Sequence, residues 1–198
     1  VSHRAAVTVE PVKNLMFYAM TATAFDPAGG GIFSVANRAT SSLDLASARI
    51  YEAGVKQQIW DNRVEWSFAA YDLRRRNVFV LLTNTTGSVA GEIDSRGVEF
   101  AAAVRPIDGL KLWGNIGTNH ARFKEFDVFT GNTPSNVAPV IANAGASYRW
   151  ERGFGWWNWR WPVEIGGSVR HVGDRFLAED NLTTMESYTI GDVYAFVD

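Results

Sequence analysis

The stretch "YEAGVKQQIW" (residues 51–60) decides the fold because apolar and polar or small residues alternate along its first half. Successive side chains of a β-strand point to opposite faces, so this alternation predicts a strand with one apolar and one polar face. The apolar positions are Tyr51, Ala53 and Val55, and the positions between them are Glu52, Gly54 and Lys56. The Asp-Asn-Arg run that follows the tryptophan is typical of a tight turn.

The same alternation returns along the whole chain. It is clearest in residues 5–10, 51–56, 97–104, 110–117, 142–150 and 163–170, and three less regular segments cover residues 15–25, 64–75 and 188–198. Apolar residues at spacings of three and four never persist for more than about two helical turns. The sequence therefore predicts an all-β fold of about nine strands.

The connections between these segments alternate between short and long. Short, turn-like connections occupy residues 11–14, 61–63 and 106–109, with a longer, tryptophan-rich connection at 151–160; long ones rich in Gly, Asn, Ser and Thr occupy residues 26–49, 78–91, 122–139 and 174–187. In an antiparallel up-and-down meander, alternate connections lie at opposite ends of the sheet. Strands of about ten residues, with short turns at one end and long loops at the other, are typical of transmembrane β-barrels of outer membranes.

Composition excludes several other classes. Nineteen Lys and Arg against 21 Asp and Glu give a net charge of −2, which argues against nucleic-acid binding. Zero cysteines exclude disulfides, thiolate metal sites and a cysteine nucleophile. No run approaches the roughly 18 apolar residues of a membrane-spanning helix, and residues 1–20 lack the basic-then-apolar order of a signal peptide.

Four segments carry a resemblance to a known family. Residues 48–78 contain Y-E-x-G-x-K, a tight turn, an aromatic-rich strand and a terminal Asn-Val; residues 91–123 contain G-x-x-x-S-x-G-x-E followed by G-L-x-L; residues 131–150 contain N-x-P; and residues 172–198 contain V-G-x-R-F and Y-x-x-x-D. In this order, the set resembles TonB-dependent outer-membrane siderophore receptors over nearly the whole chain.

The resemblance implies a 22-stranded barrel closed by an N-terminal plug, of which residues 1–198 are part of the C-terminal half, without plug, signal peptide or last strands. It implies uptake of a ferric siderophore through the bacterial outer membrane, energised by the inner-membrane TonB complex through the missing N-terminal part. Outer-membrane lipid is then a further partner. Nine strands cannot close so wide a barrel, so we expect either a longer chain or pairing between copies to cover the edges.

The sequence contains no recognisable catalytic, cofactor or metal site, so we expect no enzyme activity and no resident cofactor. His3, His120 and His171 are far apart, and the Gly-Gly-Gly at 29–31 lacks the Lys-Ser/Thr of a phosphate loop. The carboxylates Glu52, Glu99 and Glu164 occur singly on the expected inward face. We expect them to pair with Lys56, Lys111 or Arg170 rather than to act in acid–base chemistry.

Two clusters have alternative interpretations. The tryptophans at 150–161 (Trp150, Trp156, Trp157, Trp159 and Trp161) form either an interfacial aromatic girdle or the sugar-stacking platform of a soluble carbohydrate-binding β-domain. The second function predicts a polar outer surface around a dry core. The Arg-Arg-Arg at 74–76 either attracts an anionic ferric chelate or lipopolysaccharide, or forms a solvated rim. The sequence names no substrate-binding residue.

Overall fold

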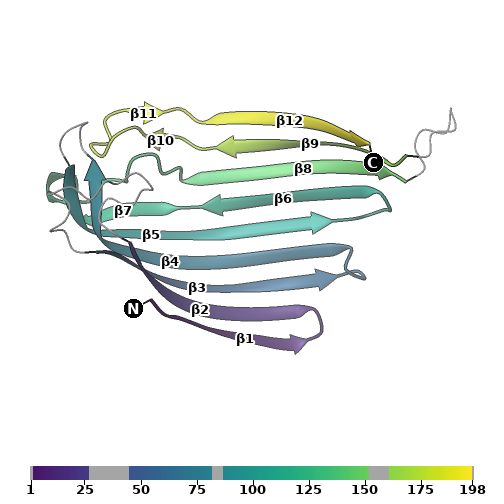
Figure 1. Ribbon diagram of the computed structural model, residues 1–198, viewed down its shortest axis with the longest axis horizontal. Coiled ribbons are helices and arrows are strands. Elements are labelled where there is room, and N and C mark those ends of the chain that lie inside the picture. Colours follow the sequence, from purple (N-terminus) through teal and green to yellow (C-terminus); the bar gives the residue numbers. More distant parts are fainter. Residues whose placement is uncertain (1, 27–44, 82–86, 152–160, 198) are drawn as a thin grey trace.

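A computed structural model describes residues 2–26, 45–81, 87–151 and 161–197, and most of them form one antiparallel sheet (Figure 1). The strands follow one another in the order β1-β2-β3-β4-β5-β6-β8-β9-β12, with β7 also paired to β5. Their bounds are β1 Arg4–Val12, β2 Leu15–Asp26, β3 Ala46–Ile59, β4 Val64–Leu81, β5 Gly87–Val104, β6 Leu110–Thr118, β7 His120–Glu125, β8 Val140–Trp150, β9 Val163–Val172 and β12 Tyr188–Val197. All nine predicted segments are strands, and the predicted meander is confirmed.

The long β5 strand is paired on one side by two shorter strands in succession. β6 covers Glu99 to Val104, and β7 covers Glu92 to Arg96. The break falls at Asn119, whose N–H donates to the carbonyl of Pro139 at 3.0 Å instead of joining the ladder. β6 and β7 therefore act as one interrupted strand, which keeps the number of positions in the meander at nine.

Short and long connections lie at opposite ends of the sheet, as predicted (Figure 1). The prediction that residues 78–91 form a loop is wrong, because β4 and β5 continue as a hairpin with pairs from Val78 opposite Ala90 to Leu81 opposite Gly87. The run Val-Phe-Val-Leu at 78–81 has high β-propensity, which outweighs the turn-like composition of the residues after it.

The two other long connections with described residues contain short ordered elements. The 122–139 segment begins inside β7 and includes a 3-10 turn at Asp127–Phe129. The 174–187 segment contains a two-residue hairpin, β10 (Arg175–Phe176) with β11 (Thr184–Met185). The long-loop end is therefore partly structured.

One face of the sheet is apolar and exposed. Residues directly opposite in neighbouring strands share a face, and the register places on this one Val7, Val9, Phe17, Tyr51, Val55, Phe68, Val98, Phe100, Leu112, Ile116, Ile165, Val169 and Val193. On β4 the band runs from Val64 to Ala70, about 20 Å at the usual rise per residue.

Very little of the described chain is a buried core. The buried cluster consists of Ile93, Phe123 and Phe126, with Val78 and Phe129 packed against it, at the long-loop end of the sheet. Among the described residues, no helix has both the length and the apolar character needed to cross a membrane. In the described part of the chain the sheet is open, because β1 pairs only with β2 and β12 only with β9.

Candidate functional site

The face opposite the apolar band is polar and forms the candidate site. Its residues come from every strand of the meander and include Thr8, Tyr18, Glu52, Lys56, Ser67, Tyr71, Glu99, Lys111, Asn115, Asn143, Ser168, Arg170 and Asp192. The predicted inward position of Glu52, Glu99 and Glu164 agrees with this register. A sheet that is apolar on one face and polar on the other suits a boundary between lipid and water.

Aromatic rings on the polar face lie across glycines of the adjacent strand. Four cross-strand pairs share this arrangement: Tyr18 with Gly54, Tyr71 with Gly97, Trp113 with Gly145, and Tyr194 with Gly166. A Cβ atom built at any of these glycines would meet the facing ring closer than normal van der Waals contact. The glycines therefore let the rings lie against the sheet rather than project from it.

The phenolic hydroxyl groups of two of these rings hold wall carboxylates. Tyr18 Oη donates to Glu52 Oε1 at 2.7 Å, and Tyr194 Oη donates to Glu164 Oε1 at 3.4 Å. The expectation that Glu52, Glu99 and Glu164 pair with Lys56, Lys111 or Arg170 is wrong. Within the described ranges, none of the three carboxylates forms an ion pair with these basic residues. Lys56 instead lies 5.4 Å from the centre of the Tyr18 ring. The spacing of charges along the sequence could not show that Tyr18 and Tyr194 reach Glu52 and Glu164 from a neighbouring strand.

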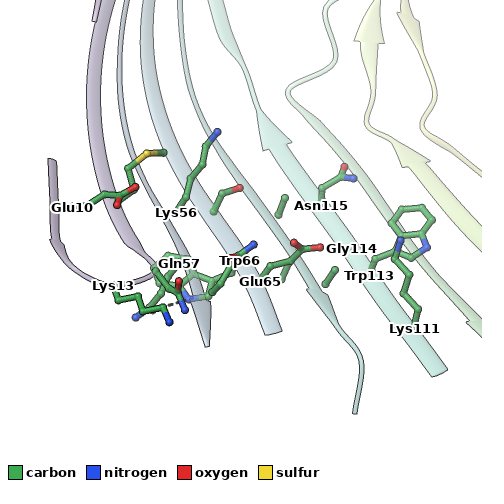
Figure 2. A pocket seen from close by; sticks show the side chains of 17 residues that line it. Glu10, Lys13, Lys56, Gln57, Glu65, Trp66, Lys111, Trp113, Gly114 and Asn115 are labelled. Carbon is green, nitrogen blue, oxygen red and sulfur yellow. Dashed lines mark hydrogen bonds between the residues drawn. The ribbon is translucent and has the colours of Figure 1, made fainter. Parts of the chain in front are cut away.

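The polar face carries two hollows. The first, of about 710 Å³, is lined by charged and aromatic side chains from β1 to β6, including Lys56, Glu65, Lys111 and Trp113 (Figure 2). The second, of about 810 Å³, lies beside Tyr18, Glu52, Tyr71 and Glu99 and reaches Asn136 in the β7–β8 connection. Basic, acidic and amide groups along both hollows can bind water and small polar solutes.

At the long-loop end, two connections are joined by hydrogen bonds into what we call the loop platform (residues 132–136 and 174–181). Glu179 accepts from both the N–H and the hydroxyl of Ser135, each at 2.8 Å. Asn181 accepts from Thr133 N and donates to Thr133 O, both at 2.8 Å. Arg175 Nε donates to Asn136 Oδ1 at 2.8 Å. Sequence reasoning singled out the Asn-x-Pro at 132–134 but not its partner, because that partner lies more than 40 residues away.

The histidines do not come together. His3 Nδ1 lies 3.2 Å from Thr23 Oγ1, His120 Nε2 accepts from Arg122 Nε at 2.9 Å, and His171 Nδ1 lies 2.9 Å from Thr189 Oγ1. Among the residues with described positions, no three His, Cys, Asp or Glu side chains group as a metal site would require. The Gly-Gly-Gly at 29–31 lies outside the described residues.

Part of the tryptophan cluster can be placed. Trp150 lies beside Tyr148 on the apolar face near the short-turn end, with ring centroids 4.5 Å apart, and Trp161 is exposed. Trp156, Trp157 and Trp159 lie outside the described residues. The position of Trp150 fits an interfacial girdle. The carbohydrate-binding alternative required a polar surface around a dry core, which the exposed apolar face contradicts.

The Arg-Arg-Arg segment divides between the two faces of the sheet. Arg75 shares the polar face with Ala48, whereas Arg74 and Arg76 share the other face with Arg49 and Ser47. Arg74 and Arg76 therefore lie above the apolar band, not on the polar wall. Attraction of an anionic ferric chelate or of lipopolysaccharide by this segment stays a prediction.

A family model described as "TonB dependent receptor-like, beta-barrel" matches residues 1–197. The chain belongs to this family. The ferrioxamine receptor of Yersinia enterocolitica is 29% identical over 150 residues, which are 75% of this chain and 20% of that protein. The metal-pseudopaline receptor CntO of Pseudomonas aeruginosa is 26% identical over 196 residues, 97% of this chain and 26% of that protein. This receptor-barrel chain thus spans about a quarter of the length of these relatives.

Solved structures show the same fold. The siderophore receptor PiuA from Acinetobacter baumannii superimposes with a TM-score of 0.79 at 19% identity, covering 98% of this chain and 29% of that one. The ferric yersiniabactin uptake receptor FyuA from Yersinia pestis gives a TM-score of 0.76 at 19% identity, covering 97% and 29%. These likenesses show that the meander has the fold of a section of those barrels.

Proposed function

We propose that this chain is a wall section of a bacterial outer-membrane receptor that imports a ferric siderophore. The observation that carries the proposal is the family match over residues 1–197 on a sheet with one apolar and one polar face. The apolar face would contact lipid, and the polar face would line the water-filled side. Relatives named for ferrioxamine and for metal-pseudopaline support a chelated metal as the cargo.

The proposed transport includes no bond chemistry. Iron would arrive enclosed by its chelator, so the wall needs no iron ligands and no resident cofactor. Energy would come from the TonB complex of the inner membrane, acting on a plug domain outside residues 1–198. The wall would contribute a hydrated, charged surface, and the hollows along Glu52, Lys56 and Glu65 supply one.

The loop platform is the part of this section that we expect to frame the outer mouth. In outer-membrane barrels the longer loops are extracellular and the short turns periplasmic. The platform fixes two neighbouring long connections through Ser135, Glu179 and Asn181. A fixed loop surface lets a chelate be bound without the cost of ordering loops on binding.

Uptake of labelled iron tests the proposed function. The gene that encodes this chain is deleted in its host, and ⁵⁵Fe uptake is measured with a panel of ferric hydroxamate, catecholate and mixed-ligand chelates. We expect uptake of one chelate class to fall to background and to return on complementation. A strain lacking TonB should give the same loss. Unchanged uptake of every chelate in the deletion strain contradicts the proposal.

A further inference from the structure

An arginine-lined groove lies on the outer, apolar face of the sheet, at its long-loop end. The groove, of about 260 Å³, is lined by three arginines (Arg49, Arg74 and Arg76), by Phe25 and Tyr51, and by one carboxylate, Asp72, which is paired with Arg96. We call it the arginine groove. It lies on the face opposite the polar wall, because Tyr51, Arg49 and Ser47 are cross-strand neighbours of Asp72, Arg74 and Arg76.

The arginine groove begins where the apolar band ends along the strands. On β4 the band ends at Ala70, and the next residues on the same face are Asp72, Arg74 and Arg76. On β5 it ends at Val98, and the next residue on that face is Arg96. On each strand, the side chains of this face change from apolar to charged between two successive positions. Such a change is expected where the hydrocarbon layer ends and the lipid head groups begin.

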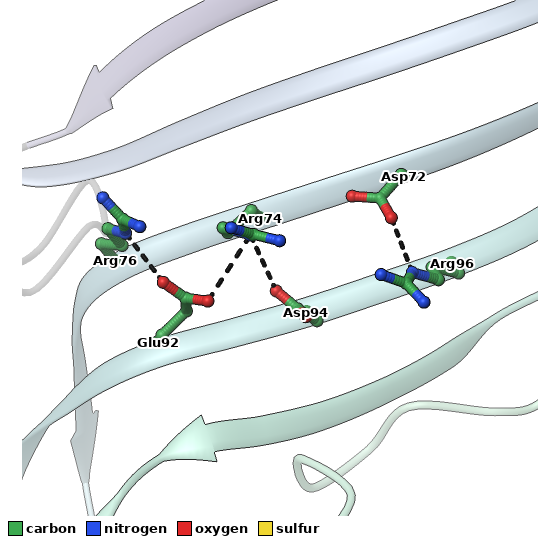
Figure 3. A network of polar contacts seen from close by, with 6 residues as sticks. All are labelled: Asp72, Arg74, Arg76, Glu92, Asp94 and Arg96. Atoms are coloured by element: carbon green, nitrogen blue, oxygen red, sulfur yellow. Dashed lines mark hydrogen bonds and ion pairs between the residues drawn. The ribbon is translucent and has the colours of Figure 1, made fainter.

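Ion pairs with the neighbouring β5 strand hold two of the groove's arginines from one side. Arg76 Nε bonds Glu92 Oε2 at 2.8 Å, and Arg74 Nε lies 3.5 Å from Glu92 Oε1 and 3.2 Å from Asp94 Oδ1 (Figure 3). A parallel pair joins Arg96 Nε to Asp72 Oδ2 at 2.6 Å. Every one of these contacts uses Nε. The terminal Nη groups of Arg74, Arg76 and Arg96 form no hydrogen bond with the described residues.

The arginines of the groove are more exposed than the β5 carboxylates that pair with them. The arginine side chains are 45% exposed at Arg74 and 59% at Arg76, whereas their partners are 20% exposed at Glu92 and 10% at Asp94. Asp72 is 39% exposed, and its charge is balanced by Arg96. Arg49 is exposed and forms no ion pair with a described residue. The surface thus presents guanidinium groups to solvent, and the carboxylates that pair with Arg74 and Arg76 lie beside them on the same face and are less exposed. Guanidinium Nη pairs bind phosphate oxygens in a two-pronged geometry.

We propose that the arginine groove binds a phosphate-bearing lipid of the outer leaflet, a proposal that relies on the membrane placement given above. The phosphates would contact Arg49, Arg74 and Arg76, and the acyl chains would run down the apolar band towards Phe68. Phe25 and Tyr51 would flank the sugar or glycerol of the head group. A lipid is favoured over a soluble anion because the groove opens directly above a surface that only acyl chains can cover.

The test measures lipid bound to the full-length protein. The protein is extracted in mild detergent from outer membranes that contain lipopolysaccharide with a short core, and native mass spectrometry counts the bound lipopolysaccharide. Arg49→Gln removes an exposed charge that has no ion pair with a described residue, and R76Q/E92Q removes Arg76 together with its partner while Arg74 keeps its contact with Asp94. We expect about fivefold less lipid for each, equivalent to the loss of one surface arginine.

The matched control is Arg63→Gln, which removes an arginine paired to Asp108 at the short-turn end. It should retain lipid within about twofold of the parent, in keeping with a change outside the groove. Wild-type retention by Arg49→Gln together with R76Q/E92Q overturns the proposal, provided that both variants show the heat-resistant mobility of a folded barrel on gels. If neither variant is folded, Arg74→Lys serves instead, since lysine keeps the positive charge but lacks the two parallel N–H donors of a guanidinium group. Undiminished lipid retention by this variant overturns the proposal.

A second arm separates a lipid from a free anion. Delipidated protein is titrated with lipid A, which carries two phosphates, with monophosphoryl lipid A, and with millimolar inorganic phosphate. We expect lipid A to bind most tightly and inorganic phosphate not to displace it; equal competition by inorganic phosphate overturns the lipid assignment. Ferric-chelate uptake is measured on the same variants. Normal uptake with reduced lipid supports both proposals, and normal uptake with no lipid on the parent rejects this one alone.

Discussion

Single glycines decide where aromatic side chains lie on the polar wall. At Gly54, inside the stretch that identified the fold, an added Cβ would lie 2.6 Å from the Phe68 carbonyl oxygen and 2.6 Å from Tyr18 Cε1. The ring could rotate away, but the backbone oxygen belongs to the paired β4 strand and cannot. The close approach also brings Tyr18 Oη to Glu52. A glycine here is therefore required by space.

Gly54→Ala should destabilise the barrel. Overpacking against a fixed neighbour typically costs about 1–3 kcal/mol, and the Tyr18–Glu52 hydrogen bond should weaken as the ring moves. Urea unfolding of the full-length protein in phospholipid vesicles measures the change. The control is Gly117→Ala, on the same face, where the nearest side-chain atom would lie at a comfortable 3.8 Å. Equal stability of the two variants would show that the wall relaxes freely around Gly54.

Among the elements, the loop platform shows how two neighbouring connections support each other. Glu179 reaches across to Ser135 and fills both the backbone and the hydroxyl donor of that residue. Asn181 bonds both backbone groups of Thr133, accepting from its N–H and donating to its carbonyl. The long loops of outer-membrane barrels contain few ladder hydrogen bonds, so side-chain bonds of this kind determine how rigid the mouth is.

Glu179→Ala should loosen the platform without unfolding the wall. Removing the carboxylate leaves two donors of Ser135 unpaired, which costs about 1–3 kcal/mol locally. Hydrogen exchange at residues 133–136 should accelerate by about tenfold or more, since that cost lowers the free energy of local opening. Asp180→Ala is the control, because among the described residues the Asp180 carboxylate bonds only the nearby Leu182 N–H. Equal protection in both variants would mean that the two connections are held by other contacts.

On the scale of the whole molecule, the sheet has two exposed faces of different polarity and does not enclose a large hydrophobic core. Large apolar side chains are exposed along one face, and the described part of the chain has only a small buried cluster at one end. A soluble protein of this size buries most of its apolar surface in a core. Under the proposed function, the stabilising burial would come from lipid on the apolar face and from pairing along the open edges of β1 and β12.

Arginine substitutions on adjacent residues should distinguish the two faces. Phe68 lies in the middle of the apolar band, opposite Phe100, and Ser67 lies next to it on the polar face. Phe68→Arg should lower the free energy of unfolding in vesicles by about 2–4 kcal/mol, the usual cost of arginine near the bilayer midplane. Ser67→Arg should cost far less. Similar losses for the two substitutions would contradict the assignment of lipid and water to the two faces.

The sequence by itself determined the strands, their order and the polarity of their faces, because alternation is a local property that each segment carries alone. Thus Tyr51, Ala53 and Val55 could be assigned to one face before any partner was known. Only the tertiary structure decided which residues meet across strands. It placed Tyr18 rather than Lys56 on Glu52, set Glu179 against Ser135, and put Arg74 beside Asp94. Those pairings depend on strand register and loop docking between residues far apart in sequence, which no single segment encodes.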